Sequence, residues 1–235
     1  MKNQIKKLLI AATVAILIFS NVQTAQAASE KSGQGTNTVV IDAGHGGADG
    51  DTAESMINLD IALRVEALMA FCSVKTVMTR EKEEIAYSEA ARTIRDKKTE
   101  DQKNRVRLIE NTKNSVLISI HQNKYPQSGP FGAQVLFSQN PPGAELAEIM
   151  QKTLVEALNR DNYRAASPVP GNVYLMNKVT CPAILIECGF LSNPNEEALL
   201  NTAAYRLKIA AAITAGYLKV EKLLTESIFG GTNEG

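Results

Sequence analysis

Two patterns of apolar and polar positions alternate along the chain, and they predict two kinds of element. Short β-branched runs predict buried strands at 38–43, 72–79, 115–121, 131–138 and 182–190. Stretches in which apolar residues recur every three or four positions predict helices with one buried face at 54–70, 144–158 and 203–220. The charged stretch 81–114 is mostly helical in pattern, with Val106 and Ile109 among its few inward-facing residues.

The order of these elements indicates the fold class. Strands alternate with helices from 38 to 220, which predicts one α/β domain with a largely parallel sheet. Asn193 is placed to cap a short helix after the last strand, with Pro194 at its first helical position. The segment 167–171, rich in proline and glycine, predicts a loop.

The N-terminal segment differs from the rest of the chain. Lysines precede an apolar run of about a dozen residues, and AQA at 25–27 supplies the small residues of a cleavage site. The run is shorter than the roughly 20 residues that a spanning helix needs. We therefore predict an export signal at 1–27, cleaved after Ala27, with an uncleaved anchor as the alternative. A flexible linker at 28–37, a folded domain at 38–222 and a polar tail at 223–235 complete the expected organisation.

Composition narrows the partners and the redox chemistry. Lys+Arg and Asp+Glu both number 25 and Trp is absent, so nothing in the charge or the aromatic content points to nucleic acid. The cysteines Cys72, Cys181 and Cys188 match no zinc-ribbon spacing, and their odd number leaves at least one free thiol. We expect Cys188, in an apolar strand, to be a small core residue. Bridges from Cys181 to Cys188 or to Cys72 are the alternatives.

Three predicted strands end in residues suited to a metal site. The first runs into the turn GHGG with His45, the third ends at His121, and the last carries Glu187. The helix after the glycine turn begins at Glu54, and sites in open α/β sheets form beyond the carboxyl ends of the strands, so these side chains are expected to converge. Two imidazoles and one carboxylate complete a catalytic zinc site, and the second carboxylate is then free to act as a general base.

Each of these residues has a plainer interpretation when it is taken alone. His45 could be a turn residue and His121 a hydrogen-bonded core histidine. Glu187 lies in the apolar strand PAILIECGF, where an unpaired carboxylate is costly, so it needs a Lys or Arg partner or a cation. A nucleotide-binding turn is disfavoured, because GHGGADG lacks the G-x-G-x-x-G spacing and acidic residues follow it. The joint occurrence of all three residues favours the metal site.

Four segments in this order resemble the motifs of the zinc-dependent N-acetylmuramoyl-L-alanine amidases of the amidase-3 type: VVIDAGHGG, ESMINLDIALRV, SVLISIHQN and AILIECGFLSNPNEEALL. The resemblance runs from about Val39 to Leu218. The segments DQKNRVRLIEN and NVYLMNKVTCPAILIECGFLSNPNEEALL resemble most the germination-specific, spore-cortex (CwlD-type) members. The resemblance implies a mixed, mostly parallel six-stranded sheet flanked by helices, and it makes 38–222 a zinc amidase catalytic domain.

The resemblance also implies roles for individual residues. His45, Glu54 and His121 fall at the positions of the zinc ligands, for one Zn²⁺ per chain, and Glu187 falls at the position of the catalytic glutamate. The loop between GHGG and Glu54 is shorter than in relatives, which leaves Asp49 or Asp51 as an alternative third ligand. The implied reaction is hydrolysis of the amide between N-acetylmuramic acid and L-alanine of the stem peptide. A silent peptidoglycan-binding or scaffold protein and a zinc peptidase acting within the stem peptide are the alternatives.

The implied partners and location follow from the same resemblance. The substrate would be peptidoglycan, through its muramyl stem peptide, on the cell-wall or spore-cortex side of the membrane. In a cortex-type member this is the intermembrane space of the forespore, and the product feeds a deacetylase that helps form muramic-δ-lactam. We find no wall-binding repeat in the sequence, so we expect an accessory exported or membrane-anchored protein to place the enzyme.

Overall fold

The computed structural model describes residues 37–48 and 52–229 of the chain. Residues from 37 onwards form a unit of their own by their contacts. The predicted export signal and the alternative ligands Asp49 and Asp51 lie outside the described residues. Within the described part, no helix is both long and apolar enough to cross a membrane.

A six-stranded sheet forms the centre of the domain, in the order β2-β1-β3-β6-β4-β5. Its strands are β1 (Thr38–Ala43), β2 (Lys75–Met78), β3 (Ser115–Asn123), β4 (Gln134–Phe137), β5 (Ser167–Pro168) and β6 (Ala183–Phe190). Pairing is parallel except between β4 and β6, which run antiparallel. The predicted single α/β domain with a mixed, mostly parallel six-stranded sheet is therefore confirmed.

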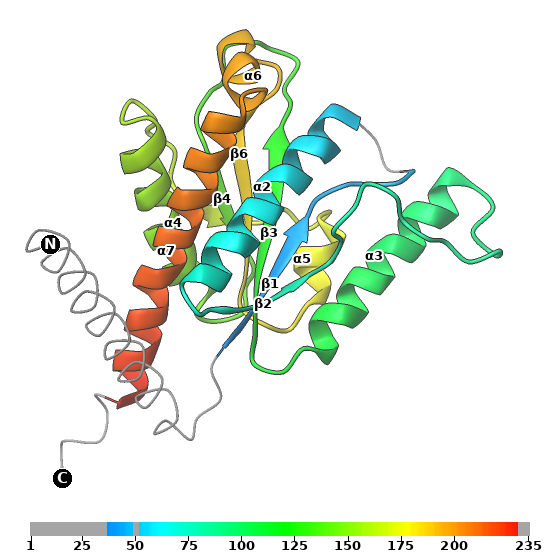
Figure 1. Cartoon of the computed structure of the whole chain (residues 1–235), viewed down its shortest axis with the longest axis horizontal. Coiled ribbons are helices and arrows are strands. Elements are labelled where there is room, and N and C mark those ends of the chain that lie inside the picture. Colours follow the sequence, from blue (N-terminus) through cyan, green and yellow to red (C-terminus); the bar gives the residue numbers. More distant parts are fainter. Residues whose placement is uncertain (1–36, 49–51, 230–235) are drawn as a thin grey trace, which may run out of the picture. The chain divides into compact units, whose positions relative to one another are not determined.

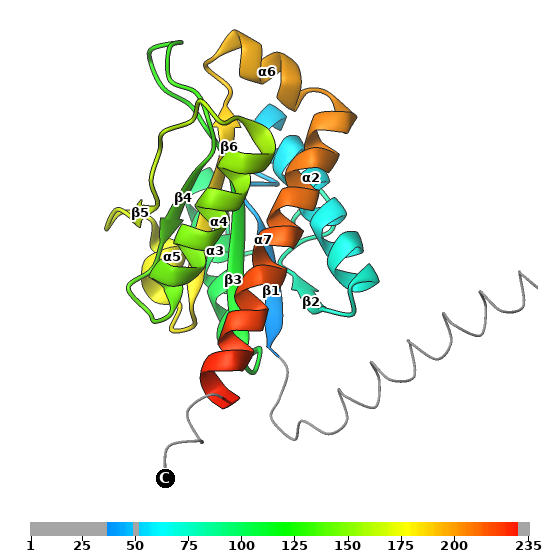
Figure 2. The same ribbon diagram turned by 90° about the vertical axis from the view of Figure 1, so that its left-hand side faces the viewer.

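Helices cover both faces of the sheet (Figures 1 and 2). The helices are α2 (Thr52–Phe71), α3 (Ile94–Asn111), α4 (Gly143–Leu158), α5 (Tyr174–Lys178), α6 (Pro194–Leu200) and α7 (Ala203–Phe229). α7 contacts both α2 and α4 on one face, whereas α3 contacts α5 on the other. Each face has its own apolar core, and alternate residues of each strand enter one or the other.

The alternation along β1 shows how this arrangement follows from the sequence. Val39, Ile41 and Ala43 enter the core beneath α2, α4 and α7, while Val40 enters the core beneath α3 and α5. All six residues of the strand are buried, because both faces are covered by helices. Asp42 shares the α3 side with Val40, so a carboxylate is buried there as well.

Most predicted elements are present, but several differ in extent. β4 is shorter than the strand predicted at 131–138, and α7 extends beyond the helix predicted at 203–220. The charged stretch 81–114 is helical only over α3, which begins at Ile94 directly after its N-cap Thr93; Thr93 and Asp96 form a capping box. Ser73 has a left-handed φ of 62°, so β2 begins later than expected. The expected loop 167–171 contains the two-residue strand β5. The helix at Pro194, with Asn193 as its cap, is confirmed.

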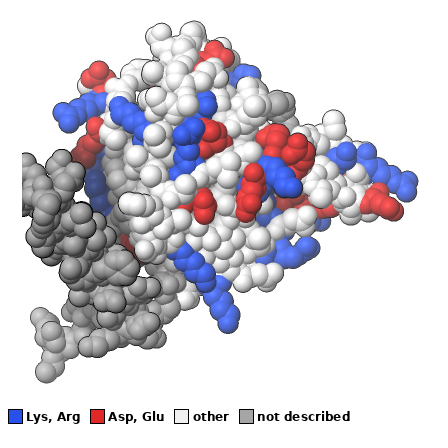
Figure 3. Space-filling model, viewed as in Figure 1, with Lys and Arg blue, Asp and Glu red and all other residues white. Residues whose placement is uncertain are grey.

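The cysteines and the surface charge complete the description. Cys72, Cys181 and Cys188 are all free, so the alternative disulfides do not form, and Cys188 is a core residue as expected. Acidic and basic side chains are intermixed on the described face seen in Figure 3. This mixture agrees with the formal net charge of zero.

Candidate metal centre

Three side chains from separate elements meet beyond the carboxyl ends of β1 and β3. His45 lies in the turn after β1, Glu54 in the first turn of α2, and His121 near the end of β3. Glu54 Oε1 lies 3.2 Å from His45 Nε2 and 3.4 Å from His121 Nδ1. The two imidazole rings meet edge to face with their centroids 5.1 Å apart. One ligand atom from each residue lies within 4.8 Å of the others, so the expected convergence of these three residues is found.

The spacing of these atoms suits a tetrahedral zinc ion. Two ligands bonded at about 2.0–2.1 Å with a tetrahedral angle between them lie ~3.3 Å apart. Both contacts of Glu54 Oε1 fall close to that separation. Two imidazoles and a carboxylate are also a donor set found in catalytic zinc sites, where a fourth position stays open. His45 and His121 are both partly exposed, so this position can be reached from solvent.

Glu54 is held in its ionised form by its neighbours. Its Oε1 accepts hydrogen bonds from the backbone N–H of Gln122 at 3.1 Å and from the side-chain amide of Asn58 at 3.3 Å. Burial raises the pKa of Glu54, but the imidazoles of His121 and His45 together with the Gln122 N–H lower it further, to well below its usual range. A carboxylate that stays ionised is the form that binds a metal ion.

Glu187 lies beside this cluster but differs from Glu54 in its environment. In the parallel pairing of β3 and β6, the Cα of Glu187 is the partner of the Cα of His121. Its Oε2 is buried, and no described residue donates a hydrogen bond to that atom. Burial raises the pKa of Glu187, and the opposing effect of the His121 imidazole is smaller. Among the described residues no Lys or Arg pairs with it, which leaves the cation as the expected partner.

The turn that presents His45 has an unusual backbone. His45 has a φ of 59°, and Gly46 and Gly47 follow with φ of 117° and 56°. Glycine adopts these values freely, whereas a histidine held in a sparsely populated region costs about 1–3 kcal/mol. Such a conformation persists only where the surroundings fix it, so the contacts of this turn determine where the His45 imidazole lies.

Two buried arginines provide these contacts through the carbonyl oxygens of residues 43–45. Arg80 donates to the carbonyls of residues 43 and 44, each at 2.9 Å, and Arg105 donates to those of residues 43 and 45. Arg80 also donates to the Ser55 carbonyl at 2.9 Å. The same guanidinium therefore links the turn that carries His45 to the first turn of α2, which carries Glu54.

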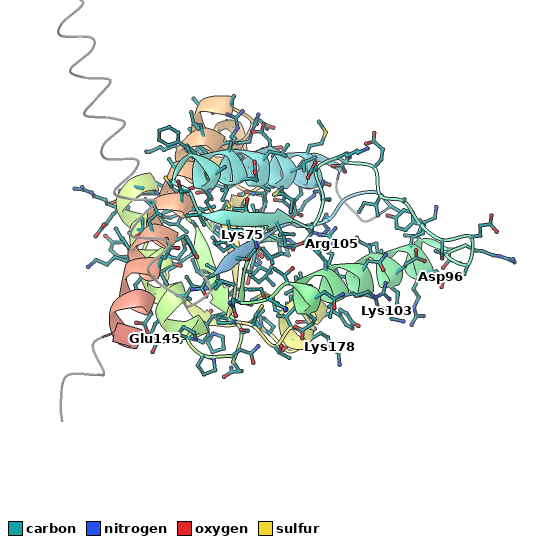
Figure 4. The ribbon with its side chains drawn as sticks, turned by 60° about the horizontal axis from the view of Figure 1, so that its bottom comes forward. Lys75, Asp96, Lys103, Arg105, Glu145 and Lys178 are labelled. Atoms are coloured by element: carbon teal, nitrogen blue, oxygen red, sulfur yellow. The ribbon has the colours of Figure 1, made fainter. Side chains whose placement is uncertain are left out.

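A buried carboxylate fixes Arg105 in turn. Asp42 Oδ1 lies 2.8 Å from Arg105 Nη1, and the Asp42 carboxylate also accepts hydrogen bonds from the hydroxyls of Thr79 and Ser119 at 2.8 and 2.6 Å. Figure 4 shows Arg105 on the side of α3 that faces the sheet. Burial raises the pKa of Asp42, but the ion pair with Arg105 and these hydroxyls lower it further.

These supporting residues were not identified from the sequence. Asp42 carried a signal, because it stands in the apolar run TVVIDA much as Glu187 stands in PAILIECGF, and a buried carboxylate needs partners. Arg80 and Arg105 carried none, since each is one of many charged residues in a polar stretch. Their role depends on distances that only the folded chain brings together.

We predict that Gly44→Ala weakens zinc binding by about 10- to 100-fold, the range seen when residues that orient a ligand are changed. A Cβ at Gly44 would lie 2.4 Å from the His121 ring, and the Gly44 backbone is not left-handed, so the effect is steric. Zinc titration by calorimetry measures the change. Gly129→Ala is the matched control, because a Cβ there meets nothing within 4 Å. Equal affinities in the two variants would contradict this role of Gly44.

We predict that Asp42→Asn lowers the free energy of unfolding by about 3 kcal/mol at pH 7, because it leaves Arg105 partly uncompensated. The folded-state pKa of Asp42 lies below the ordinary carboxyl value of about 3.9. Its stabilisation is therefore fully present above about pH 4 and is lost as the pH falls through the folded-state pKa. Urea unfolding between pH 7 and pH 3 measures the difference in free energy of unfolding between the wild type and Asp42→Asn. This difference should stay constant down to about pH 4 and become smaller below it. A difference independent of pH throughout would contradict the assignment.

Comparisons with known proteins agree with the resemblance of the four segments. Residues 39–219 match the N-acetylmuramoyl-L-alanine amidase family. The germination-specific N-acetylmuramoyl-L-alanine amidase of Bacillus subtilis is 34% identical over 187 residues, which cover 77% of this chain and 78% of that protein.

Solved structures show the same fold. The CwlD amidase from Clostridioides difficile, in complex with the GerS lipoprotein, is 36% identical with a TM-score of 0.76 over 80% of this chain and 100% of that one. The catalytic domain of CwlV from Bacillus (Paenibacillus) polymyxa var. colistinus is 28% identical with a TM-score of 0.65 over 79% and 98%. The chain therefore belongs to the N-acetylmuramoyl-L-alanine amidase family and is a peptidoglycan amidase.

Proposed function

We propose that the protein hydrolyses the amide between N-acetylmuramic acid and L-alanine with one zinc ion held by His45, Glu54 and His121. In this proposal Glu187 is the general base and acid. The observation that carries it is the position of Glu187. This buried carboxylate has no hydrogen-bond partner at Oε2 among the described residues, and it is in register with His121, one of the two imidazoles that meet Glu54 at ligand spacing. The donor set supports zinc over magnesium and calcium, because those two metals prefer sites made of oxygen ligands alone.

The residues of the site divide the chemistry between them. A zinc ion bound here supplies Lewis acidity, which polarises the amide carbonyl and makes water a stronger nucleophile. Glu187 accepts the proton that water loses as it attacks the carbonyl carbon, and it then delivers that proton to the leaving amine of L-alanine. The carboxylate thus ends in its starting form. Its raised pKa supports this role, because a more basic carboxylate accepts a proton from water more readily.

We further propose that the enzyme acts in maturation of the spore cortex, upstream of a deacetylase that helps form muramic-δ-lactam. The similarity to the germination-specific amidase of Bacillus subtilis supports this role. An accessory exported or membrane-anchored protein is part of the proposal, supported by the Clostridioides difficile relative, whose structure was solved with a lipoprotein. Its export depends on the signal proposed at 1–27, and its place of action is the cortex side of the forespore membrane.

We predict that Glu187→Gln retains its zinc and loses turnover by several orders of magnitude, because the substitution removes the proton acceptor but no ligand. His121→Ala should lose both. Elemental analysis gives the metal content, and release of stem peptide from purified peptidoglycan, with the products identified by mass spectrometry, gives the activity.

Glu197→Gln, a change of an exposed glutamate on α6, is the matched control. Full activity in Glu187→Gln would disprove its role in proton transfer. Products cut within the stem peptide would indicate the peptidase, and zinc-independent binding without cleavage would indicate the silent wall protein.

We predict that the full chain, expressed in sporulating Bacillus subtilis that lacks its germination-specific amidase, restores muramic-δ-lactam, and that the Glu187→Gln variant does not. Muropeptide analysis of the spores measures the lactam. A chain that cleaves isolated peptidoglycan and accumulates in the spore envelope, yet leaves the cortex without lactam, would contradict the cortex role and leave the amidase activity intact.

A further inference from the structure

The side of Glu187 away from the imidazoles is formed by strand β4. In the antiparallel pairing of β4 and β6, Gln134 is the partner of Glu187, so His121, Glu187 and Gln134 lie side by side across three strands. The next paired residues are Asn123 and Phe190. From the His121–Glu187 pair to this pair β3 advances by two residues and β6 by three, which marks a bulge in β6. The bulge brings Phe190, the partner of Asn123, to the same face of the sheet as Glu187.

Arg164 lies against both of these neighbours of Glu187. Its Nη1 donates to Gln134 Oε1 at 3.2 Å, its Nε donates to the Phe131 carbonyl at 2.9 Å, and its guanidinium carbon lies 4.6 Å from the centre of the Phe190 ring. Two hydrogen bonds and a stacked ring fix the plane of the guanidinium. The remaining nitrogen, Nη2, has no protein partner among the described residues, and the side chain is partly exposed.

The charge of Arg164 is not compensated within the described part of the chain. Its two acceptors are a carbonyl and an amide, which are neutral. The other arginines held by more than one hydrogen bond from their side chains each pair with a carboxylate: Arg64 and Arg206 with Asp60, Arg80 with Glu83, and Arg105 with Asp42 and Asp101. A fixed guanidinium whose Nη2 carries two unused N–H donors is suited to binding an anion such as a carboxylate.

We propose that Arg164 binds a carboxylate of the stem peptide, on the peptide side of the scissile amide. This inference rests on the proposed function. Adjacent strands lie about 4.8 Å apart, so Arg164, one step beyond Gln134, is ~10 Å from the position of Glu187. An extended peptide advances about 3.3–3.6 Å per residue. The carboxylate that reaches Arg164 therefore belongs to the second or third residue of the stem. Arg164 then favours substrates in which this carboxylate is free over substrates in which the same group is amidated.

Three synthetic muramoyl tripeptides test the assignment: one with free carboxylates, one amidated at the second residue and one amidated at the third. The wild-type enzyme should lose about tenfold or more in kcat/KM on one of the two amidations, the size expected for a charged hydrogen bond. Arg164→Gln should lose a similar factor on the free substrate, mainly through KM, and its ratio between free and amidated substrates should fall to about one. Arg164→Lys keeps the charge without the fork and should give an intermediate ratio.

Arg160→Gln is the matched control, because it makes the same charge change at an exposed arginine in the same segment, and its ratio should equal that of the wild type. Melting temperature and zinc content confirm that each variant is folded. A wild-type ratio retained in Arg164→Gln, or a wild-type enzyme that does not distinguish the three substrates, overturns the role of Arg164. Failure of the wild type to release peptide from any of them overturns the proposed function instead.

Discussion

The parallel register of β1, β3 and β6 determines where each polar group of the site lies. Asp42 pairs with Ser119, and one pleat further on His121 pairs with Glu187. Side chains alternate between the two faces of a strand, so a slip of one residue would turn every one of these groups toward the apolar core beneath α2, α4 and α7. The large apolar residues between them, such as Ile118 and Ile120, oppose that slip because they fill this core.

The buried charges are arranged in two layers. The inner layer, made by Asp42, Arg80 and Arg105, is paired and turns its remaining donors toward the carbonyls of the turn that carries His45. Removal of Asp42 or Arg105 would leave the other charge buried without its partner, so a change in this layer is strongly destabilising. The outer layer contains His45, Glu54, His121 and Glu187, and its two imidazoles are partly exposed to solvent. The hydrogen bonds of the inner layer to residues 43–45 therefore fix the turn that carries His45 from beneath.

The sequence predicted the outer layer and missed the inner one, for a physical reason. His45, His121 and Glu187 follow or occupy apolar strands, and parallel strands bring their carboxyl ends to one edge whatever the details of packing. Arg105 reaches the turn from the middle of α3, and its place depends on the packing angle of that helix, which no local pattern encodes. The extent of α3 escaped prediction similarly, because a polar stretch has little apolar periodicity to mark where the helix begins.

The arrangement around Gln134 explains how a cation and a carboxylate can lie near each other and both stay available. Gln134 is the neighbour of Glu187 in register, and its Oε1 accepts a hydrogen bond from Arg164. A direct ion pair between Arg164 and Glu187 would lower the pKa of the carboxyl and occupy the remaining donors of the guanidinium. The Gln134 amide is neutral, so it holds Arg164 by a hydrogen bond and does not form an ion pair with it. In the proposed mechanism each charged group then acts on a different part of the substrate, the carboxylate on the scissile amide and the guanidinium on the peptide beyond it.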